Sequence, residues 1–503
     1  MIGTSSTQLL CDDLPTQRQL NLETVLVAGA TGYIGGRLVP ELIARGYRVR
    51  IMVRRESEEM QLLWPEVEVV IADALCEDQL ESAMEGVHTA YYLIHSMLIG
   101  PHSFAEADRC AAHHFRLSAA RQQVQRIIYL GGLGDRQSSL SSHLSSRMEV
   151  GQELAAGSVP VTFLRASIII GSGSASYEML NHLVRRLPIM PIPRWAKTRT
   201  QPIGLRDVIK YLVGALELPA TAGKTYDIGG PDVMSYEQLL RTHAQVLGRK
   251  RLFFSSPFSN ISFFAGMTSL LTPVPSAITR CLMESVEHEM ICEDQELAYL
   301  LPFRRISSRE ALVLALSREE QDAVHTRWTD NYPPHHELAI KLSELEAPPT
   351  YGCRYSLESS VSAEALFQSI SHIGGERGWF YSTPLWRIRG FIDRLVRGVG
   401  LRRGRRSPTQ LRINDVVDFW RVEKIRAPRW LLLRAEMKSP GLAWLAFEVE
   451  EQEQGRELSV QAHFQADGFW GHLYWYIFLP FHYFIFQDLS RQIERRAREI
   501  DDG

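Results

Sequence analysis

GATGYIGG, residues 29 to 36, follows the apolar run VLVA and precedes a stretch in which Ile34, Leu38 and Leu42 recur at helical spacing. Glycines at this spacing between a strand and a helix allow a tight turn, a close approach to a pyrophosphate and close packing of the helix on the strand, with the helix N-terminus facing the anion. The stretch therefore predicts a Rossmann-type dinucleotide site. The residues expected to hold the dinucleotide here are Gly29, Thr31, Gly32, Tyr33, Ile34 and Gly35.

The same rhythm continues along the first two-thirds of the chain. Short β-branched runs alternate with helical patterns, as in YRVRIMVRR, VEVVIAD, TAYYLIHS, RIIYLGG and PVTFLRASIII. Continuous apolar strands separated by helices indicate a parallel sheet covered on both faces. We expect an α/β fold with a doubly wound parallel sheet over residues 24–340, after a flexible N-terminal tail over residues 1–23.

The ends of the second and third strands carry the signal for the type of dinucleotide. Arg54 and Arg55 follow the second strand, where an NAD-binding protein usually offers an acid to the ribose hydroxyls. Guanidinium groups suit a 2′-phosphate, so the pair favours NADP(H) over NAD(H), and the alternative is two solvated arginines. Asp73, followed by Ala74, closes the third strand and is expected within reach of the adenine.

Five segments carry a resemblance to a known family: GATGYIGG, IADALCEDQL, IIYLGGLG, LRASIIIGSGSAS and TRTQPIGLRDVIKYL. They resemble the atypical short-chain dehydrogenase/reductase proteins, the branch that includes NmrA-like regulators and the NADPH-binding accessory subunit of respiratory complex I. The resemblance covers roughly residues 24–330. It implies the fold and the nucleotide cofactor, and much less about any reaction.

The usual catalytic residues of that superfamily are missing. Members that do chemistry typically have a Ser or Thr after the fifth strand and Tyr-x-x-x-Lys on the next helix, whereas this chain has Gly131 and Gly132, then His143 and Arg147. Residues four apart share a helix face, so Arg147 is expected to contact the nicotinamide ribose. A permanent cation lowers the pKa of a neighbouring imidazole, which makes His143 a better base than proton donor at pH 7.

Two interpretations of His143 stay open, because SSLSSHLSSR also reads as serine caps before a helix in which His143 has no chemistry. The serines that are candidates for the missing hydroxyl are Ser141, Ser142, Ser145 and Ser146. Candidate substrate-pocket residues further along are Arg199, Gln201, Asp207 and Tyr236, unless the Arg206/Asp207 pair only ties a loop to the sheet. The apolar but proline-broken residues 253–289 are expected to form lid helices over a hydrophobic cleft rather than a membrane span.

After a linker expected at residues 341–352, the pattern changes to alternating runs. In RWLLLRAEMK, Leu431 and Leu433 point one way while Arg434 and Glu436 point the other, which predicts an antiparallel sheet with one face in water.

A strand and a helix precede these runs, and a long helix over 471–500 is expected to cover the apolar face of the sheet. This α+β order resembles the helix-grip arrangement of START-like proteins, so residues 353–503 are expected to enclose a hydrophobic small molecule. The whole chain also resembles bacterial proteins in which an atypical short-chain dehydrogenase is fused to a C-terminal domain of unknown function.

Two segments of this last third contain more aromatic or more basic side chains than a hydrophobic core requires. The aromatic segment from Phe469 to Phe486 is compatible with a cavity lining, with contact at a membrane interface or with a membrane span. The basic amphipathic segment from Arg387 to Arg406 suits an anionic lipid surface or an acidic partner, the alternative being a solvated loop.

Composition narrows the class of protein. A net charge of −3 argues against a general nucleic-acid binder, and six scattered cysteines offer no zinc or disulfide spacing, so no metal is predicted. The N-terminus has no signal-peptide pattern, so we expect a cytoplasmic protein with peripheral contact at the inner face of the cytoplasmic membrane. The expected function is an NADP(H)-dependent oxidoreductase or isomerase of a lipid-, quinone- or isoprenoid-like compound, and the alternative is a non-catalytic NADPH-sensing or assembly protein.

Overall fold

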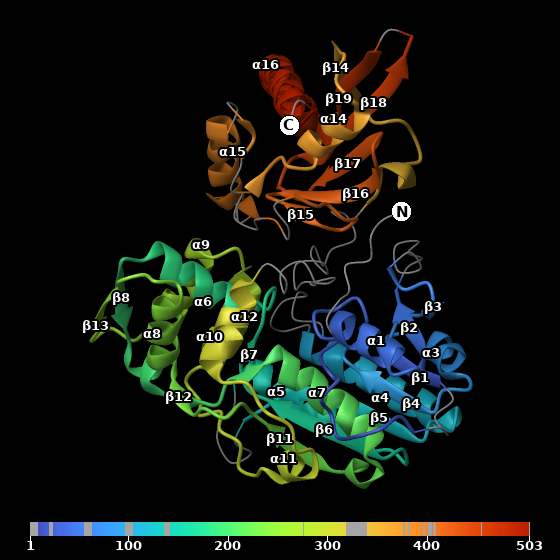
Figure 1. The fold of residues 1–503 in the computed structure, drawn as a ribbon, viewed down its shortest axis with the longest axis vertical. Coiled ribbons are helices and arrows are strands. Elements are labelled where there is room, and N and C mark those ends of the chain that lie inside the picture. Colours follow the sequence, from blue (N-terminus) through green and yellow to red (C-terminus); the bar gives the residue numbers. More distant parts are fainter. Residues whose placement is uncertain are drawn as a thin grey trace. The chain divides into compact units, whose positions relative to one another are not determined.

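A computed structural model describes the chain in two compact units, Met1–Asn331 and Tyr332–Gly503, each of which is treated by itself below (Figure 1). The described residues are 9–19, 24–54, 63–95, 104–134, 141–274, 276–317, 340–375, 378–380, 383–395, 398–400, 405, 409–453 and 455–501.

The N-terminal unit is built on a seven-stranded sheet with the order β11-β6-β5-β4-β1-β2-β3. Each neighbouring pair of these strands is parallel, which confirms the predicted doubly wound sheet. The order reverses between β1 and β4, and in such sheets ligands bind at this switch point, outside the carboxyl ends of the strands. The strands are β1 (Thr24–Ala28), β2 (Arg48–Val53), β3 (Glu68–Ile71), β4 (Thr89–Tyr92), β5 (Arg126–Gly132), β6 (Val161–Ala166) and β11 (Thr225–Ile228).

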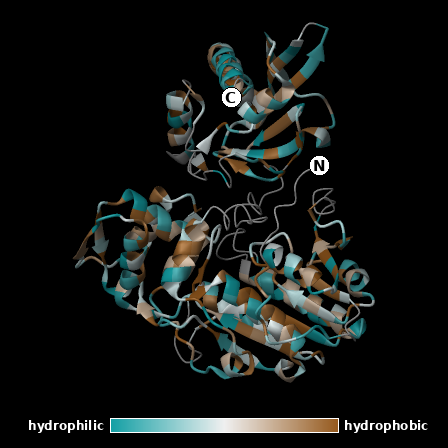
Figure 2. Cartoon of the chain, viewed as in Figure 1, coloured by the Kyte–Doolittle hydropathy of each residue, from teal (hydrophilic) through white to brown (hydrophobic). Residues whose placement is uncertain are grey.

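Helices cover both faces of this sheet because successive residues of a strand point to opposite faces. Val25 and Val27 of β1 share a core with α1 (Gly35–Ala44) and α7 (Leu205–Glu217). Leu26 and Ala28 share a second core with α3 (Glu77–Met84), α4 (Phe104–Arg121) and α5 (Ser142–Ala155). Along these helices, hydrophobic residues alternate with hydrophilic ones (Figure 2), as expected for helices with one face on a sheet.

The rest of the N-terminal unit is a set of short elements. The segment predicted to form lid helices contains α9 (Ile261–Leu271) and α10 (Ser276–Ser285), of which Phe264 and Met283 pack with Trp195. The other elements are β7 (Ile169–Ile170), α6 (Ala175–Arg186), β8 (Ile189–Ile192), η1 (Arg194–Lys197), β9 (Arg199–Thr200), β10 (Ile203–Gly204), η2 (Pro219–Thr221), β12 (Met234–Ser235), α8 (Tyr236–Val246), β13 (Leu252–Ser255), α11 (Glu296–Leu300) and α12 (Ser308–Leu316).

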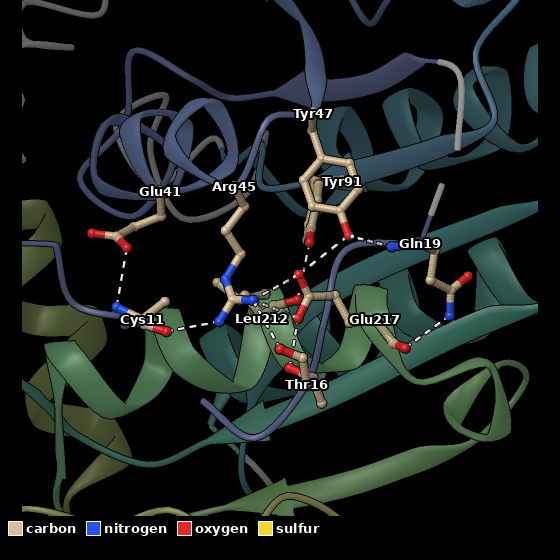
Figure 3. Close-up of polar contacts among 9 residues, drawn as sticks. All are labelled: Cys11, Thr16, Gln19, Glu41, Arg45, Tyr47, Tyr91, Leu212 and Glu217. Carbon is tan, nitrogen blue, oxygen red and sulfur yellow. Dashed lines mark hydrogen bonds and ion pairs between the residues drawn. The ribbon is translucent and has the colours of Figure 1, made fainter. Parts of the chain in front are cut away.

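The expectation of a flexible tail over residues 1–23 is wrong for residues 9–19. Cys11 is 2% exposed and joins the core of α1 and α7. The carboxylate of Glu41 accepts a hydrogen bond from the backbone N–H of Leu10 at 2.8 Å and another from that of Cys11 at 3.1 Å. Figure 3 shows the bond from Cys11. Arg45 donates to the Cys11 carbonyl at 2.7 Å and pairs with Glu217 at 3.1 Å. Residues 9–19 are held by hydrogen bonds to their backbone groups and by single buried side chains. Such contacts produce no periodic pattern of hydrophobic residues, so the sequence did not predict them.

The C-terminal unit contains a six-stranded antiparallel sheet with the order β14-β19-β18-β17-β16-β15, as predicted. The long last helix, α16, packs one face on β14, β19 and α14, which confirms that a final helix covers the sheet. The elements are η5 (Leu342–Glu344), β14 (Tyr351–Ser359), α14 (Ala363–Ile370), α15 (Thr383–Leu395), β15 (Val416–Val417), β16 (Trp420–Arg426), β17 (Trp430–Ala435), β18 (Gly441–Gln452), β19 (Gly455–Ala466) and α16 (Gly468–Asp501).

The second face of this sheet is in water along β14, where Arg354, Ser356 and Glu358 are exposed, but contrary to the prediction it is covered around Arg434. Arg434 is 7% exposed and Glu436 is 1% exposed, and Glu436 accepts hydrogen bonds from the buried Arg421. Leu342 and Leu345, which lie in the segment expected to be a linker, pack against Leu432 and Trp444 on this face. The alternating charges are therefore buried ion pairs covered by the chain that leads into β14.

Candidate functional site

The glycine loop between β1 and α1 brings three backbone segments closer than side chains allow. Gly29 has a φ of +96°, and a Cβ there would lie 2.7 Å from the carbonyl oxygen of Leu93. A Cβ on Gly35 would lie 2.2 Å from the carbonyl oxygen of Gly29. The Gly32 N–H closes the turn by donating to the Gly29 carbonyl at 2.9 Å. Both glycines are thus required by the packing of the helix start against the strand ends.

The N-terminus of α1 is available to an anion. Its N-cap residue is Ile34, which makes no side-chain capping bond, and the first turn contains no acidic residue. The N–H groups of Gly36 and Arg37 donate to the carbonyls of Gly32 and Ile34, at 2.9 and 3.0 Å, so the attraction for an anion comes from the partial positive charge of the helix N-terminus. The space at Gly29 and Gly35 that a Cβ atom would fill is suited to the close approach of a dinucleotide pyrophosphate. The helix start, which has no side-chain cap, is also suited to this anion.

The residues predicted to set the adenosine end lie after the neighbouring strands. Arg54 directly follows β2 and is exposed, while Arg55 lies outside the described residues. Asp73 accepts a hydrogen bond from the Leu75 N–H at 2.9 Å, so its carboxylate shapes the turn after β3, and Ala74 is buried.

Two further residues of the predicted set, Thr31 and Tyr33, lie in the glycine loop and are partly buried. A Cβ on Gly171 would lie 2.5 Å from the Tyr33 hydroxyl, which places that ring against the segment after β7. The structure thus places the glycine-loop residues, Arg54 and Asp73 of the predicted dinucleotide set at the carboxyl ends of β1, β2 and β3.

The start of α5 lies beside the end of β5, as the predicted catalytic alignment requires. A Cβ on Gly132 would lie 2.9 Å from a methyl group of Leu144 and 4.0 Å from the Cγ of Arg147. The Tyr129 hydroxyl donates to the backbone carbonyl of Arg147 at 3.0 Å, which fixes the helix against the sheet. A larger residue at 132 would therefore displace Leu144.

The serines at the start of α5 have different partners. Ser141 is the N-cap, accepting from the Leu144 N–H at 3.3 Å, and its hydroxyl lies 3.0 Å from that of Ser285. Ser145 donates to Glu149 at 3.0 Å. The Ser146 hydroxyl is buried and has no hydrogen-bond partner in the described part of the chain. The predicted serine cap is confirmed, the side chain of Ser142 lies outside the described residues, and Ser146 has the hydroxyl without a partner among the candidate serines that are described.

A histidine pair that the sequence analysis missed lies at the switch point. His95 follows the end of β4, two residues beyond the Leu93 carbonyl that touches Gly29, and its ring centroid is 5.3 Å from that of His143. The Nδ1 atom of His95 lies 3.2 Å from the carboxylate of Asp108, which is 2% exposed. The His95 Nε2 and His143 Nδ1 atoms are buried without a hydrogen-bond partner among the described residues.

Burial decides the charge of both imidazoles. Burial lowers the pKa of His95 to about 4, with a further decrease from Arg147 and a partial increase from Asp108. Burial also lowers the pKa of His143 well below its ordinary value, with smaller contributions from His95 and Arg147. The predicted direction is correct for His143, but burial rather than the cation is the main cause. Both rings are neutral near pH 7, each with one N–H and one bare nitrogen.

Three of the four downstream candidates have structural roles. Arg199 forms an exposed ion pair with Glu289. Gln201 is buried and bonds to the Gly230 carbonyl and the Cys292 N–H. Asp207 is fully buried in α7 and accepts from the Ile306 N–H at 3.0 Å, so it ties a loop to this helix rather than to the sheet. The fourth candidate, Tyr236, packs with Leu133, Leu144 and Met290 beside the start of α5.

The C-terminal unit contains an apolar cavity of about 270 Å³ between its sheet, α15 and α16. Its walls include Leu385 and Trp386 of α15, Leu445 of β18, and Trp475 and Phe486 of α16. The predicted aromatic segment thus contributes to a cavity wall. None of the helices in the described ranges combines the length and apolarity that a membrane span requires.

Comparison with known proteins decides the family. Residues 21–278, just over half of the chain, match the model of the NmrA-like family. The chain belongs to the NmrA-like family. This confirms the predicted kinship with atypical short-chain dehydrogenases, and the N-terminal unit has their NAD(P)-binding fold. Residues 350–489 of this NmrA-like protein match a second family, described as a protein of unknown function (DUF2867).

Individual relatives are more distant. The mitochondrial NADH dehydrogenase [ubiquinone] 1 alpha subcomplex subunit 9 of Arabidopsis thaliana is 25% identical over 240 residues, 46% of this chain and 60% of the relative, less than two thirds of its length. The ceramide reductase of Caulobacter vibrioides (strain NA1000 / CB15N) is 27% identical over 259 residues, 50% of this chain and 80% of the relative. The N-terminal part also matches the structure of a Citrobacter sp. triphenylmethane reductase complexed with NADP(H). The match extends over 58% of this chain and 100% of the reductase chain, at 19% identity and a TM-score of 0.48.

Proposed function

We propose that the protein is an NADP(H)-dependent oxidoreductase or isomerase that acts on a hydrophobic, lipid-, quinone- or isoprenoid-like compound. The observation that carries the proposal is the His95–His143 pair, backed by Asp108, at the switch point next to the glycine loop. Buried titratable groups with shifted pKa values at the ligand-binding edge of a sheet are typical of catalytic sites.

The residues that would hold the cofactor follow from the geometry above. The α1 N-terminus and the backbone from Gly29 to Gly35 would bind the pyrophosphate, and the exposed Arg54 would bind the 2′-phosphate. Arg147, one helical turn after His143, would bind the nicotinamide ribose. When bound, the nicotinamide supplies or accepts a hydride.

His95 is the residue proposed to move the proton. The Asp108 carboxylate favours the tautomer with the proton on Nδ1, which leaves a bare Nε2 that takes a proton from a substrate hydroxyl. The same carboxylate then stabilises the imidazolium that forms. In the direction of reduction, the protonated His95 returns the proton, so reduction of a carbonyl is expected to accelerate as the pH falls from 7 toward the pKa of about 4.

Two observations support a hydrophobic substrate. A ceramide reductase is among the relatives of the N-terminal unit. The C-terminal unit contains an apolar cavity whose lining includes Trp386, Trp420 and Trp475. An apolar pocket with few polar groups is the usual form of a site for such a molecule.

Cofactor titration and turnover test this proposal. NADPH is expected to bind more tightly than NADH, and Arg54→Glu is expected to weaken NADPH binding selectively. With a panel of long-chain ketones and quinones, NADPH oxidation is expected to fall about 100-fold or more in His95→Gln, as for loss of a general acid or base. The exposed His113→Gln serves as the control on α4.

One observation favours the non-catalytic alternative. Both imidazoles are neutral at pH 7, and His143 and Arg147 occupy the Tyr and Lys positions of the usual enzymes, so neither ring is an imidazolium that could donate a proton in the resting state. Tight NADPH binding without turnover on any hydrophobic carbonyl or alcohol, at any pH from 5 to 8, would assign the protein to NADPH sensing or assembly.

A further inference from the structure

The C-terminal unit carries a patch of exposed apolar side chains on two neighbouring helices. In α16, residues 468–487 contain no Asp, Glu, Lys or Arg, and Arg389 of α15 donates to the hydroxyl of Tyr474 in α16 at 3.4 Å. This apolar patch is composed of Leu385 (43% exposed), Ile388 (57%), Phe391 (60%) and Ile392 (45%) on α15, and of Phe469 (72%), Trp470 (69%), Leu473 (37%), Tyr476 (61%), Ile477 (54%), Leu479 (38%), Phe481 (47%), Tyr483 (59%) and Phe484 (68%) on α16. A contiguous exposed surface of this kind marks an interaction site.

The cavity of the C-terminal unit opens within this apolar patch. Four of the patch residues also line the cavity, so their side chains are in contact with both the cavity and the outside: Leu385, Ile388, Ile392 and Phe481. A molecule that enters between α15 and α16 therefore passes from one apolar surface to another.

Three residues of the cavity wall each have a buried polar atom without a partner among the described residues. The indole Nε1–H groups of Trp386 and Trp420 and the Nδ1 of His482 are buried, and no hydrogen-bond partner is found for them among the described residues. Burial lowers the pKa of His482 to about 4, so this ring is neutral at pH 7. Buried donors without partners are uncommon and costly, and two indole N–H groups can donate only to an acceptor. The ligand expected here has an apolar body and an acceptor oxygen.

The charges around the apolar patch indicate what covers it. Residues 383–393 and 468–487 contain three charged side chains: Arg387, Arg389 and Asp393. Asp393 is fully buried and accepts hydrogen bonds from the N–H groups of Gly400 and Lys438, whereas Arg387 and Lys438 are exposed. Exposed Asp467 precedes Phe469, so Arg387 and Lys438 together with this one carboxylate leave the exposed charge at the patch net positive, and two copies of the chain that met here would place like net charges together.

We propose that the C-terminal unit docks on an anionic membrane through the apolar patch and takes from it an amphiphile whose acceptor oxygen bonds to Trp386 and Trp420. The uncharged first half of α16 is roughly 30 Å long, as 20 helical residues are, and lies flat with one face on the sheet and the other in the lipid interface. Trp470, Tyr476 and Tyr483 have the amphipathic rings that are enriched at that interface. This inference concerns the C-terminal unit alone and does not depend on the reaction proposed above.

Vesicle sedimentation of the full chain tests the docking. The chain is expected to sediment with vesicles of phosphatidylcholine and phosphatidylglycerol (7:3), and to bind them at least tenfold more tightly than phosphatidylcholine alone. The double variant Phe469→Ser/Phe484→Ser is expected to lose binding about 100-fold, because two exposed aromatic rings no longer enter the lipid. Tyr299→Ser, at an 82% exposed residue of the N-terminal unit, is the control and should bind like the parent chain.

Two results would overturn the docking. One is a parent chain that stays in the supernatant with both vesicle types. The other is a parent chain that light scattering shows to be dimeric while the double variant is monomeric, because the patch would then bind a second copy.

Tryptophan fluorescence with two small probes tests the cavity. The full chain is expected to bind 2-undecanone more tightly than undecane, because only the ketone offers an acceptor to the indole N–H groups. Trp386→Phe keeps the apolar bulk and is expected to reduce this preference about tenfold, the effect of one lost hydrogen bond. Ala443→Trp, which fills the cavity, is expected to abolish binding of both probes while circular dichroism stays unchanged.

Equal binding of ketone and alkane by the parent chain, or full binding by a folded Ala443→Trp, would refute the assignment. An unfolded Ala443→Trp leaves the comparison of the parent chain with Trp386→Phe as the test. No measurement in either set involves NADPH or turnover, so a failure here is distinguishable from a failure of the proposed reaction.

Discussion

Substitution of Gly35 by alanine tests whether the close contact of α1 with β1 forms the dinucleotide site. The added Cβ would lie 2.2 Å from the Gly29 carbonyl oxygen and 2.8 Å from the Cα of Ala30. Both neighbours are backbone, so relief requires the helix start and the strand end to separate by roughly 1 Å. Overpacking of this kind costs about 1–3 kcal/mol of stability.

The same displacement moves the N–H groups that would bind the pyrophosphate. A hydrogen bond to a charged group is worth about 1.5–3 kcal/mol, so the loss of one raises the Kd for NADPH about 10- to 100-fold. NADPH fluorescence titration measures this change, and a thermal melt measures the loss of stability.

Gly266→Ala is the matched control, because Gly266 lies in α9 with nothing within 4 Å of its Cβ position. Alanine there favours the helix by about 0.5–1 kcal/mol and leaves binding unchanged. If Gly35→Ala bound NADPH within twofold of the parent chain, the glycine loop would not be the pyrophosphate site.

Two further predictions concern stability. Glu217, whose side chain is fully buried, pairs with Arg45 and accepts from Thr16 and Tyr47, so Glu217→Ala is expected to cost about 3–5 kcal/mol and to expose residues 9–19 to proteolysis. Exposed Glu346→Ala is the control, and equal melting temperatures of the two variants would contradict the anchoring role. His95 has an ordinary pKa of 6.5 when unfolded and about 4 when folded, so the unfolded chain binds more protons below pH 6.5 and stability falls as the pH decreases from about 6.5 to 4, by at most ~3 kcal/mol for this group. His95→Gln is expected to flatten that part of the pH profile of thermal unfolding, and an unchanged slope would show that the ring is not buried as described.

The candidate site was only partly accessible to sequence reasoning. The glycine loop, the alternation of strands and helices, and the helix that begins at Ser142 follow from local spacing, and the structure has each of them. His95 was missed because a single histidine after an apolar strand has no motif, although its place after a strand at the switch point was a usable signal. Asp108 gave no signal, since it is one of many charged residues on a helix.

The charges of the last third show why local pattern failed there. Arg434 and Glu436 alternate with Leu431 and Leu433 in the manner of a solvated strand, yet they are buried because residues before β14 fold back over that face. Likewise, Cys11 and Leu14 lie in a polar segment with no periodicity and are buried by contact with helices that begin far along the chain.

The sequence by itself determined the order of elements, the doubly wound sheet and the place of the dinucleotide loop, because these depend on glycine spacing and on apolar residues repeating along single elements. The tertiary structure alone decided which titratable groups meet and which are out of water. His95, Asp108 and His143 come from the segment after β4, from α4 and from α5, and the walls of the C-terminal cavity come from α15, α16 and the sheet together. Burial and distance are properties of such assemblies, and they set the pKa values and the unpaired donors on which the proposed chemistry depends.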